Sequence, residues 1–307
     1  MSVMGALTRF ERWYAYTCRP HRGKGIVLRL LQKLVRGRVF VADLDQGFRM
    51  WLHTDDWVTS EMFFSGTWED QNTRVVRRIL ESACAFVDVG ANIGYYTLLA
   101  SKVLKHGAVF AYEPMPSTFE WLERNIRLNK CRNVECFPIA ISDQVGETTI
   151  HLFASDSFAS ASQFQAWRSD AVESVRVPTT TLDSHLLPRL PKVPSNMLMK
   201  VDAEGGEFAI FRGAEQLLTS VRPILMFELF PALADAAGWQ PEQLLGHLKG
   251  YGYEFFIPQP DGTVRPLVDD DIPSPSIEGH IDVFAFRGDV EWHRQCLPRC
   301  TNESGAD

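Results

Sequence analysis

Cysteine is scarce in this sequence, and long apolar runs are missing. The 307 residues include six cysteines, whereas disulfide-stabilised scaffolds are short and cysteine-dense. The cysteines also lack the spacing of a zinc ribbon. No uninterrupted apolar stretch reaches the roughly 18 residues of a membrane-spanning helix, and no basic leader followed by an apolar core opens the sequence. These absences predict a reduced, cytoplasmic protein with no transmembrane segment.

No large excess of either charge marks the whole chain, but the charges are unevenly distributed. The net charge is -7 and hydrophobic residues make up 45%, which is ordinary for a globular enzyme and predicts no nucleic-acid partner. Residues 1–40 hold nine Lys or Arg against one acid, a net +8, whereas the remainder holds 22 basic and 37 acidic residues, a net -15. The basic segment predicts an anionic surface as a partner. Its amphipathic stretch from Ile26 to Arg36 either lies on a membrane surface or packs one apolar stripe against the domain.

The most informative segment is AFVDVGANIGYYT, residues 85–97. An apolar strand ends at Asp88, a turn of small residues follows, and a helical segment begins at Tyr95. A glycine turn between a strand and a helix lets a ligand approach the backbone closely. The next apolar strand, Ala108 to Tyr112, is followed by Glu113, an acid placed to accept hydrogen bonds from ribose hydroxyls. We therefore expect a nucleoside-type ligand at this turn.

The glycine spacing disfavours a nicotinamide or flavin dinucleotide. The dinucleotide fingerprint needs three glycines as G-x-G-x-x-G, and the matching positions here are Gly90, Asn92 and Tyr95. Asp88 would repel a pyrophosphate but suits an ammonium group. S-adenosylmethionine carries an ammonium, a carboxylate and a ribose diol without phosphate, so it fits these two acids. A turn of this type without any ligand is the alternative.

Three segments together resemble the FkbM-type S-adenosylmethionine-dependent methyltransferases. They read DVGANIGYYT, YEPMPSTFEWLERNIRLN and KVDAEGGEFAIFRGAEQLL, in the family's order, and the resemblance extends from about Glu61 to Glu228. It implies a class I methyltransferase fold with S-adenosyl-L-methionine as cofactor. It also implies methylation of a hydroxyl on a sugar or secondary metabolite, so the expected partner is a small-molecule or glycan acceptor.

The segments after residue 69 alternate between strand and helix, which predicts a Rossmann-like α/β sheet with helices on both faces. We expect this sheet to be mostly parallel with an antiparallel last strand. Two weaker strands, Glu147 to Phe153 and Ser174 to Val177, are expected to pair as an inserted hairpin. Ser117 and Glu120 predict a capping box at the start of a helix. The predicted domains are a basic helical and hairpin cap (1–65), a cofactor-binding methyltransferase domain (66–290) and a tail (291–307).

The expected positions of residues at strand ends and turns of this fold predict which of them contact the cofactor. Seven residues are predicted to bind the cofactor: Asp88, Gly90, Asn92 and Gly94 along the methionine part, Glu113 at the ribose, and Ser142 and Asp143 at the adenine. Asp143 alternatively begins the turn that ends at Gly146.

Acids converge where the fourth strand of the sheet ends, in KVDAEGGE. Methyl transfer from a sulfonium is an in-line displacement, and a hydroxyl nucleophile must also lose its proton. Asp202 is the predicted catalytic base or hydroxyl-orienting residue, and Glu204 is the second candidate. Glu207 is expected to cap the following helix and Lys200 to neutralise the cluster. We predict no metal; a magnesium ion held by Asp202, Glu204 and Glu228 is the less favoured alternative.

Two other classes of function remain open. One is a nicotinamide-dependent, sugar-modifying oxidoreductase, against which the missing third glycine argues. The other is a non-catalytic or RNA-associated module recruited through the basic N-terminus; the absence of an RNA-binding motif and the acids at the strand ends argue against it. Among the eight histidines, His185 and His280 are further candidate bases.

Overall fold

The computed structural model describes residues 37–53, 57–104, 106–153, 161–162, 171–190, 196–274 and 279–297. The described residues build three sheets, of eight, four and two strands. No helix among them is long and apolar enough to cross a membrane. The predicted basic helix from Ile26 to Arg36 lies outside the described residues, so its anionic partner stays a prediction.

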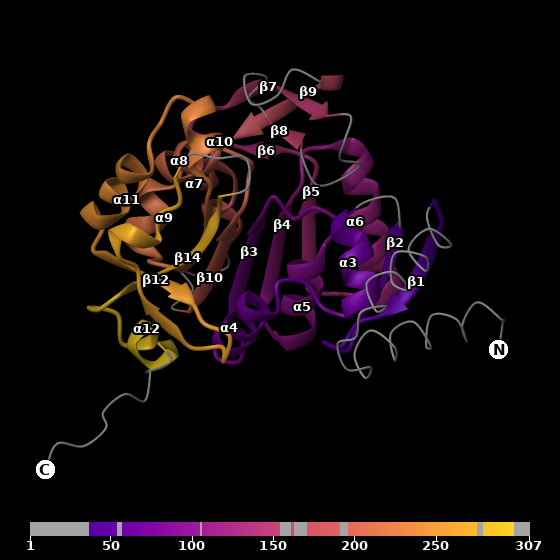
Figure 1. The fold of residues 1–307 in the computed structure, drawn as a ribbon, viewed down its shortest axis with the longest axis horizontal. Helices are drawn as coiled ribbons and strands as arrows, with labels where there is room; N and C mark the ends of the chain where they lie inside the picture. Colours follow the sequence, from indigo (N-terminus) through magenta and orange to yellow (C-terminus); the bar gives the residue numbers. More distant parts are fainter. Residues whose placement is uncertain are drawn as a thin grey trace, which may run out of the picture.

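An eight-stranded sheet forms the centre of the molecule (Figure 1). Its strands are β3 (Ala85–Val89), β4 (Ala108–Tyr112), β5 (Val134–Phe137), β10 (Met197–Val201), β11 (Ile224–Leu229), β12 (Tyr253–Pro258), β13 (Val264–Pro266) and β14 (Ile281–Arg287). The order is β13-β12-β14-β11-β10-β3-β4-β5, and the run from β11 to β5 is parallel throughout. The last strand, β14, is antiparallel to both β11 and β12. This confirms the predicted fold class; the edge strand β13 adds a second antiparallel member.

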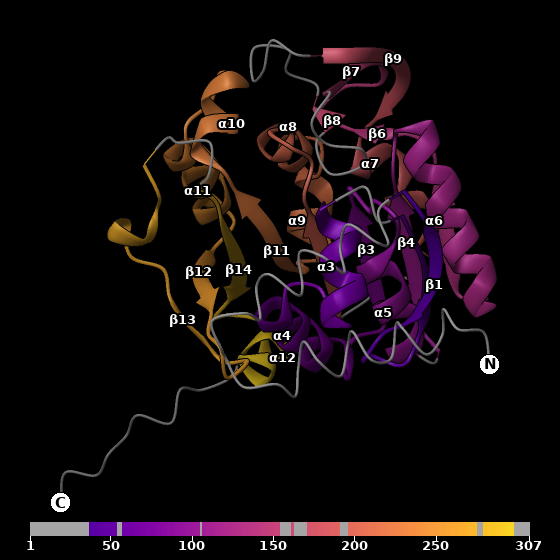
Figure 2. The ribbon, with the colours of Figure 1, turned by 45° about the vertical axis from the view of Figure 1, so that its right-hand side comes forward.

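Helices cover both faces of this sheet, as the alternation of strand and helix predicts (Figure 2). One face packs against α3 (Trp57–Ser65), α4 (Asp70–Leu80), α5 (Tyr95–Val103), α6 (Pro116–Asn129) and α12 (Glu291–Cys296). The other face packs against α7 (Leu182–His185), α8 (Glu207–Arg212), α9 (Glu215–Ser220), α10 (Pro231–Ala236) and α11 (Pro241–Gly250). Successive side chains of a strand point to opposite faces, so Phe86 joins the first core and Val87 the second. Because both faces are buried, the central strands are apolar almost throughout.

The start of α6 differs from the sequence prediction. The helix begins at Pro116 with Met115 as its N-cap, and no side chain caps it. Proline suits the first helical turn, because an N–H there would have no partner within the helix. The Met115 N–H instead donates to Glu113 Oε1 at 3.0 Å. The predicted capping box of Ser117 and Glu120 is therefore wrong, since the proline sets the helix start before Ser117.

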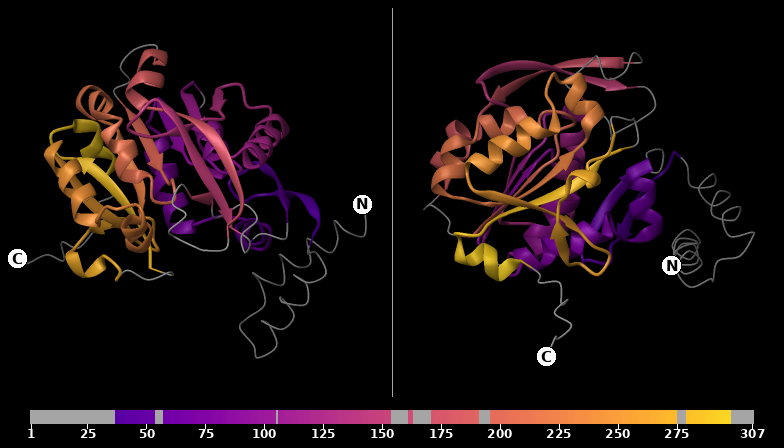
Figure 3. Two further views of the ribbon diagram at one scale, coloured as in Figure 1. Left: turned by 90° about the horizontal axis from the view of Figure 1, so that it is seen from above. Right: turned by 60° about the vertical axis from the view of Figure 1, so that its left-hand side comes forward.

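A small four-stranded sheet lies across one end of the large sheet (Figure 3). Its strands are β6 (Ala140–Ile141), β7 (Gly146–Phe153), β8 (Ala161–Ser162) and β9 (Ala171–Thr180). β7 and β9 pair antiparallel from Gly146 to Phe153, which confirms the predicted inserted hairpin. Because β6 follows directly after β5, the small sheet lies at the carboxyl ends of the parallel strands.

An N-terminal hairpin is held against α6. It consists of β1 (Val39–Asp43) and β2 (Arg49–His53), paired antiparallel as predicted. Two asparagines of α6 bind its backbone: Asn125 Oδ1 accepts the Trp51 N–H at 2.7 Å, and Asn129 Oδ1 accepts the Arg49 N–H at 2.9 Å. These bonds fix the hairpin to the helix that follows Glu113. The domain boundaries at residues 65 and 290 stay predictions.

Candidate active site

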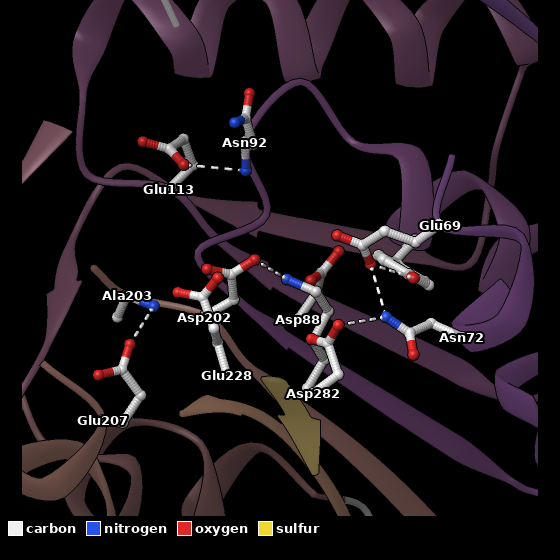
Figure 4. Close-up of polar contacts among 12 residues, drawn as sticks. Glu69, Asn72, Asp88, Asn92, Glu113, Asp202, Ala203, Glu207, Glu228 and Asp282 are labelled. Atoms are coloured by element: carbon white, nitrogen blue, oxygen red, sulfur yellow. Dashed lines mark hydrogen bonds and ion pairs between the residues drawn. The ribbon is translucent and has the colours of Figure 1, made fainter. Parts of the chain in front are cut away.

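The predicted site residues meet at the carboxyl ends of the parallel strands. β3 pairs with β4 on one side and with β10 on the other. The chain runs outward from β3 to β5 and then returns to β10, so the strand order reverses between β3 and β10. Open α/β sheets bind ligands at such a switch point. Figure 4 shows the residues that converge there.

The glycines of the turn after β3 are needed for close packing within the protein. Gly90 has φ +75°, and a Cβ there would lie 1.7 Å from the Asp202 carbonyl oxygen. Gly94 has φ +97°, and its Cβ would meet Leu122 Cδ1 at 2.6 Å. The sequence predicts that this space serves ligand approach, whereas the Asp202 carbonyl and the Leu122 side chain occupy it. The close contact at Gly90 brings the backbone of Asp202 against the turn.

Glu113 points its carboxylate at this turn (Figure 4). Its Oε2 accepts the Asn92 N–H at 2.9 Å, and its Oε1 accepts the Met115 N–H. The side chain is buried, and burial raises the pKa of the carboxyl to about 7, although both backbone N–H groups lower it. A carboxylate oxygen has two lone-pair sites, so each oxygen retains the capacity to accept one more hydrogen bond. This arrangement suits recognition of a ribose diol.

Asp88 is buried beside the same turn with one oxygen unused. Its Oδ2 accepts the Thr97 hydroxyl at 2.6 Å. Its Oδ1 is buried and has no hydrogen-bond partner among the residues that the structure describes. Burial raises the pKa of Asp88, while the nearby Lys200 cation opposes that shift. A buried acceptor without a donor fits the ammonium group of the predicted cofactor, since an unmet buried polar group is costly.

Lys200 supplies positive charge at the centre of the acids. It pairs in register with Asp88, and its Nζ lies 2.9 Å from Asp202 Oδ2. Burial alone would lower the pKa of Lys200, but Asp202, Asp88 and Glu69 outweigh it and raise the pKa. The lysine therefore stays charged, which agrees with the neutralising role expected of it. The Asp202 side chain is 36% exposed, so it is open to a ligand.

Glu207 supports the loop that carries Asp202 and Glu204. Its Oε1 accepts the Ala203 N–H at 2.8 Å and the Gly205 N–H at 3.3 Å. Burial raises the pKa of this carboxyl to about 7. Glu207 is the first residue of α8, but its carboxylate binds N–H groups of the loop before the helix and no side chain caps α8, so the capping role expected of it is wrong. Glu204 is half-buried with φ 49°, a left-handed conformation that is strained for a side chain of this size.

The structure adds four residues to the site that the sequence did not indicate: Glu69, Asn72, Tyr96 and Asp282. Asp282 of β14 lies directly opposite Glu228 of β11. Asn72 Nδ2 donates to Asp282 Oδ2 at 2.7 Å and to Glu69 Oε2 at 3.0 Å. Tyr96 Oη also donates to Glu69 Oε2, at 2.7 Å. In the sequence, Asp282 is only an acid near the start of an apolar strand, and Glu69 is only an acid directly before a helix. Neither pattern indicates which residues it contacts. We call the full set the acidic rim: Glu69, Asp88, Asp202, Glu204, Glu207, Glu228 and Asp282.

Because Asp282 and Glu228 face each other, we predict that the stability of the protein depends on pH. Burial and the nearby Glu69 raise the pKa of Asp282 from 3.8 to about 8, although the Asn72 bond opposes this. The folded state therefore binds this proton more tightly than the unfolded state, and the stability it contributes is lost as pH rises from about 4 through about 8. We expect Asp282→Asn to raise the melting temperature at pH 8.5, by about 2–4 °C per kcal/mol of repulsion removed. At pH 5 the change should be near zero, as measured by thermal denaturation.

Asp261→Asn is the matched control for that measurement. Asp261 is exposed in a turn, and hydrogen bonds from Thr263 lower its pKa. Removing its charge should therefore not stabilise the protein at high pH. An equal rise in melting temperature for both variants would contradict a role for the Glu228–Asp282 pair.

Ser142 and Asp143 follow β6 and contact the end of α8. The Asp143 carboxylate forms an ion pair with Arg212, and Ser142 Oγ donates to Asp143 Oδ1 at 3.3 Å. A Cβ on Gly213 would lie 2.1 Å from the Ser142 carbonyl oxygen, so the two segments pack closely. Asp143 thus has a protein partner, and its contact with adenine stays a prediction.

The magnesium alternative rested on Asp202, Glu204 and Glu228. Within the described ranges, no group of three or more His, Cys, Asp or Glu side chains is arranged to hold a metal ion.

The two candidate histidine bases lie in different surroundings. Tyr112 Oη lies 3.1 Å from Nδ1 of His185, and that histidine packs against Phe137. The other, His280, lies at the acidic rim, 3.9 Å from Glu228.

A doubly wound sheet with an acid near the end of β3, an acid directly after β4 and further acids at the switch point defines a class I methyltransferase fold. Residues 88–255 match the Methyltransferase FkbM domain, more than half of the chain. The chain therefore belongs to the FkbM methyltransferase family. This membership supports S-adenosyl-L-methionine as its cofactor, and the open acceptor sites of Asp88 and Glu113 fit that cofactor's ammonium and ribose.

The similarity to individual known proteins is distant. "Methyltransferase 1" of Beauveria bassiana (strain ARSEF 2860) is 27% identical over 166 residues, which span 49% of this chain and 66% of that protein, slightly less than two thirds. A precorrin-6y C5,15-methyltransferase from Geobacter metallireducens GS-15 has a TM-score of 0.40 at 14% identity, covering 72% of this chain and 89% of its own. A putative rRNA-methylase from Clostridium thermocellum has a TM-score of 0.43 at 10% identity, covering 70% and 92%. With scores this low, neither structure indicates the substrate of this chain.

Proposed function

We propose that this chain transfers a methyl group from S-adenosylmethionine to a hydroxyl of a sugar or secondary metabolite. The observation that supports the proposal is the arrangement across the β3–β10 switch point. Asp88 and Glu113 face the turn with unused acceptor capacity, and the partly exposed Asp202 ends the neighbouring strand. Cofactor-binding groups and an acceptor-binding carboxylate therefore lie side by side.

The turn residues hold the cofactor in this proposal. Asp88 Oδ1 accepts a hydrogen bond from the ammonium, and the Glu113 oxygens accept from the ribose hydroxyls. Gly90, Asn92 and Gly94 give the backbone its sharp path between β3 and α5, with Asn92 held at φ 50° and its N–H bonded to Glu113. Ser142 and Asp143 are proposed at the adenine. When bound, S-adenosylmethionine supplies an activated methyl group on a cationic sulfur.

The acceptor side is proposed at Asp202 and Glu204. Lys200 fixes the Asp202 carboxylate through the 2.9 Å ion pair, so Asp202 is oriented before the acceptor binds. Holding the hydroxyl in line with the methyl group replaces an unfavourable bimolecular encounter. The acidic rim disfavours anionic acceptors such as sugar phosphates, because like charges repel in a partly buried site. We therefore propose a neutral polyol acceptor.

Methyl transfer to neutral glycosides tests this function. The probes are methyl α-D-glucopyranoside, methyl α-D-galactopyranoside and methyl α-L-rhamnopyranoside with labelled S-adenosylmethionine. We expect base-stable methyl ethers by mass spectrometry, and calorimetric binding of S-adenosylhomocysteine but not of NAD. Tighter binding of NAD than of S-adenosylhomocysteine would instead favour the oxidoreductase alternative. Binding of the cofactor without transfer to any glycoside would refute this acceptor class.

A further inference from the structure

Two carboxylates of the acidic rim, those of Glu207 and Asp202, already accept hydrogen bonds from donors within the protein. Glu207 accepts backbone N–H groups of its own loop, and a proton on its Oε1 would weaken those bonds. Asp202 is paired with Lys200, and protonation would leave a buried ammonium without its nearest counter-charge. These residues suit binding and orientation better than they suit acceptance of a proton during the reaction.

Glu228 has different surroundings. It is the penultimate residue of β11, 18% exposed, with Asp282 opposite it on β14. His280 Nε2 lies 3.9 Å from Glu228 Oε1, and the imidazole is 51% exposed. The Phe230 ring, 5.7 Å from the imidazole, packs beside it. The exposed imidazole of His280 therefore lies between the Glu228 carboxylate and solvent.

We propose that Glu228 accepts the proton of the acceptor hydroxyl and that His280 transfers it to solvent. This inference rests on the proposed function and assigns Asp202 the orienting role. The hydroxyl oxygen forms a bond to the methyl carbon as the carbon–sulfur bond breaks, and its proton passes to the Glu228 carboxylate. Glu228 then passes that proton to His280 Nε2, and the imidazole releases it to water, so that both groups regain their starting protonation states. The 3.9 Å separation is closed by a small rotation or by one bridging water.

The groups around Glu228 favour this role. Burial raises its pKa well above 4.5, and Asp202, Glu204, Asp282 and Glu207 raise it further. These acids come from the β10–α8 connection, α8 and β14, while His280 faces Glu228 from the residue before β14. A raised pKa makes the ionised Glu228 carboxylate a stronger base than an exposed glutamate, which favours proton abstraction from a hydroxyl.

The test compares Glu228→Gln and His280→Ala with the wild type, using the three methyl glycosides above. Glu228→Gln should lower kcat by about 100-fold or more and leave the affinity for S-adenosylhomocysteine unchanged. It should also reduce the fall in melting temperature between pH 5 and pH 8, because the raised pKa makes this group destabilising as it loses its proton. His280→Ala should lower kcat less, and added imidazole should restore it.

His106→Ala is the matched control, since His106 is also exposed but lies away from the acidic rim, after α5. It should retain full activity and show no response to imidazole. A wild type that methylates a glycoside, together with a Glu228→Gln variant of normal kcat, would overturn this relay while the proposed function stands. Loss of activity in His280→Ala without rescue by imidazole would overturn the role of His280. A wild type that methylates none of the glycosides would overturn the relay together with the proposed acceptor.

Discussion

Asp202→Asn is expected to lower methyl transfer by about 100-fold or more, because the acceptor hydroxyl loses the group that orients it, and to preserve cofactor affinity. The amide keeps the shape of the carboxylate but lacks its charge and its capacity to accept from both the hydroxyl and Lys200. Lys200 would then remain buried without the carboxylate that lies 2.9 Å from its Nζ. Steady-state kinetics with a methyl glycoside and calorimetry with S-adenosylhomocysteine separate the two effects.

Asp261→Asn controls for a general effect of replacing aspartate, since Asp261 lies in an exposed turn and its carboxylate accepts hydrogen bonds from Thr263 of the same turn. We expect it to be fully active. Full activity of Asp202→Asn would instead mean that the Lys200–Asp202 pair is structural. Catalysis would then depend on positioning by other residues of the acidic rim.

Glu113→Ala is expected to weaken cofactor binding by about 1–3 kcal/mol, which corresponds to roughly 5- to 150-fold in Kd. Two contributions add to this loss. The ribose hydroxyls lose their acceptor, and the Asn92 and Met115 N–H groups lose theirs, so the turn is less well ordered. Calorimetry with S-adenosylhomocysteine measures the change directly.

Glu120→Ala is the control for Glu113→Ala, because Glu120 is exposed on α6, close in sequence to Glu113. It should bind the cofactor product as the wild type does. Equal affinities for Glu113→Ala and the wild type would remove Glu113 from the proposed cofactor site. Glu113→Gln should lie between the two, since the amide retains one acceptor oxygen for a backbone N–H.

The elements nearest the cofactor turn are predictable because their signals are local. The apolar run of β3, the small residues after it and the apolar run of β4 lie within about thirty consecutive positions, and strand ends follow from polarity alone. The positions of Asp88 and Glu113 at those ends therefore follow from the sequence. The need for glycine at position 90 does not follow from the sequence, because the Asp202 carbonyl that excludes a side chain there is more than 100 residues away in the chain.

The acidic rim shows where sequence patterns cease to determine contacts. Glu228 and Asp282 face each other only because β14 enters the sheet antiparallel between β11 and β12. Glu69 joins them through Asn72, a hydrogen bond between the first turn of α4 and the far end of the chain. Asp282 and Glu69 carry no local pattern that indicates their neighbours, so the sequence did not indicate either of them as a site residue.

The sequence by itself determined the fold class, the strand ends and the type of ligand, because hydrophobic alternation and turn chemistry act over a few residues. Only the tertiary structure decided which acids share one site, which of them Lys200 and the backbone N–H groups engage, and that His280 lies beside Glu228. These outcomes depend on strand order and register. Register determines which side chains face each other across neighbouring strands, and burial then determines which carboxylates hold a proton near neutral pH.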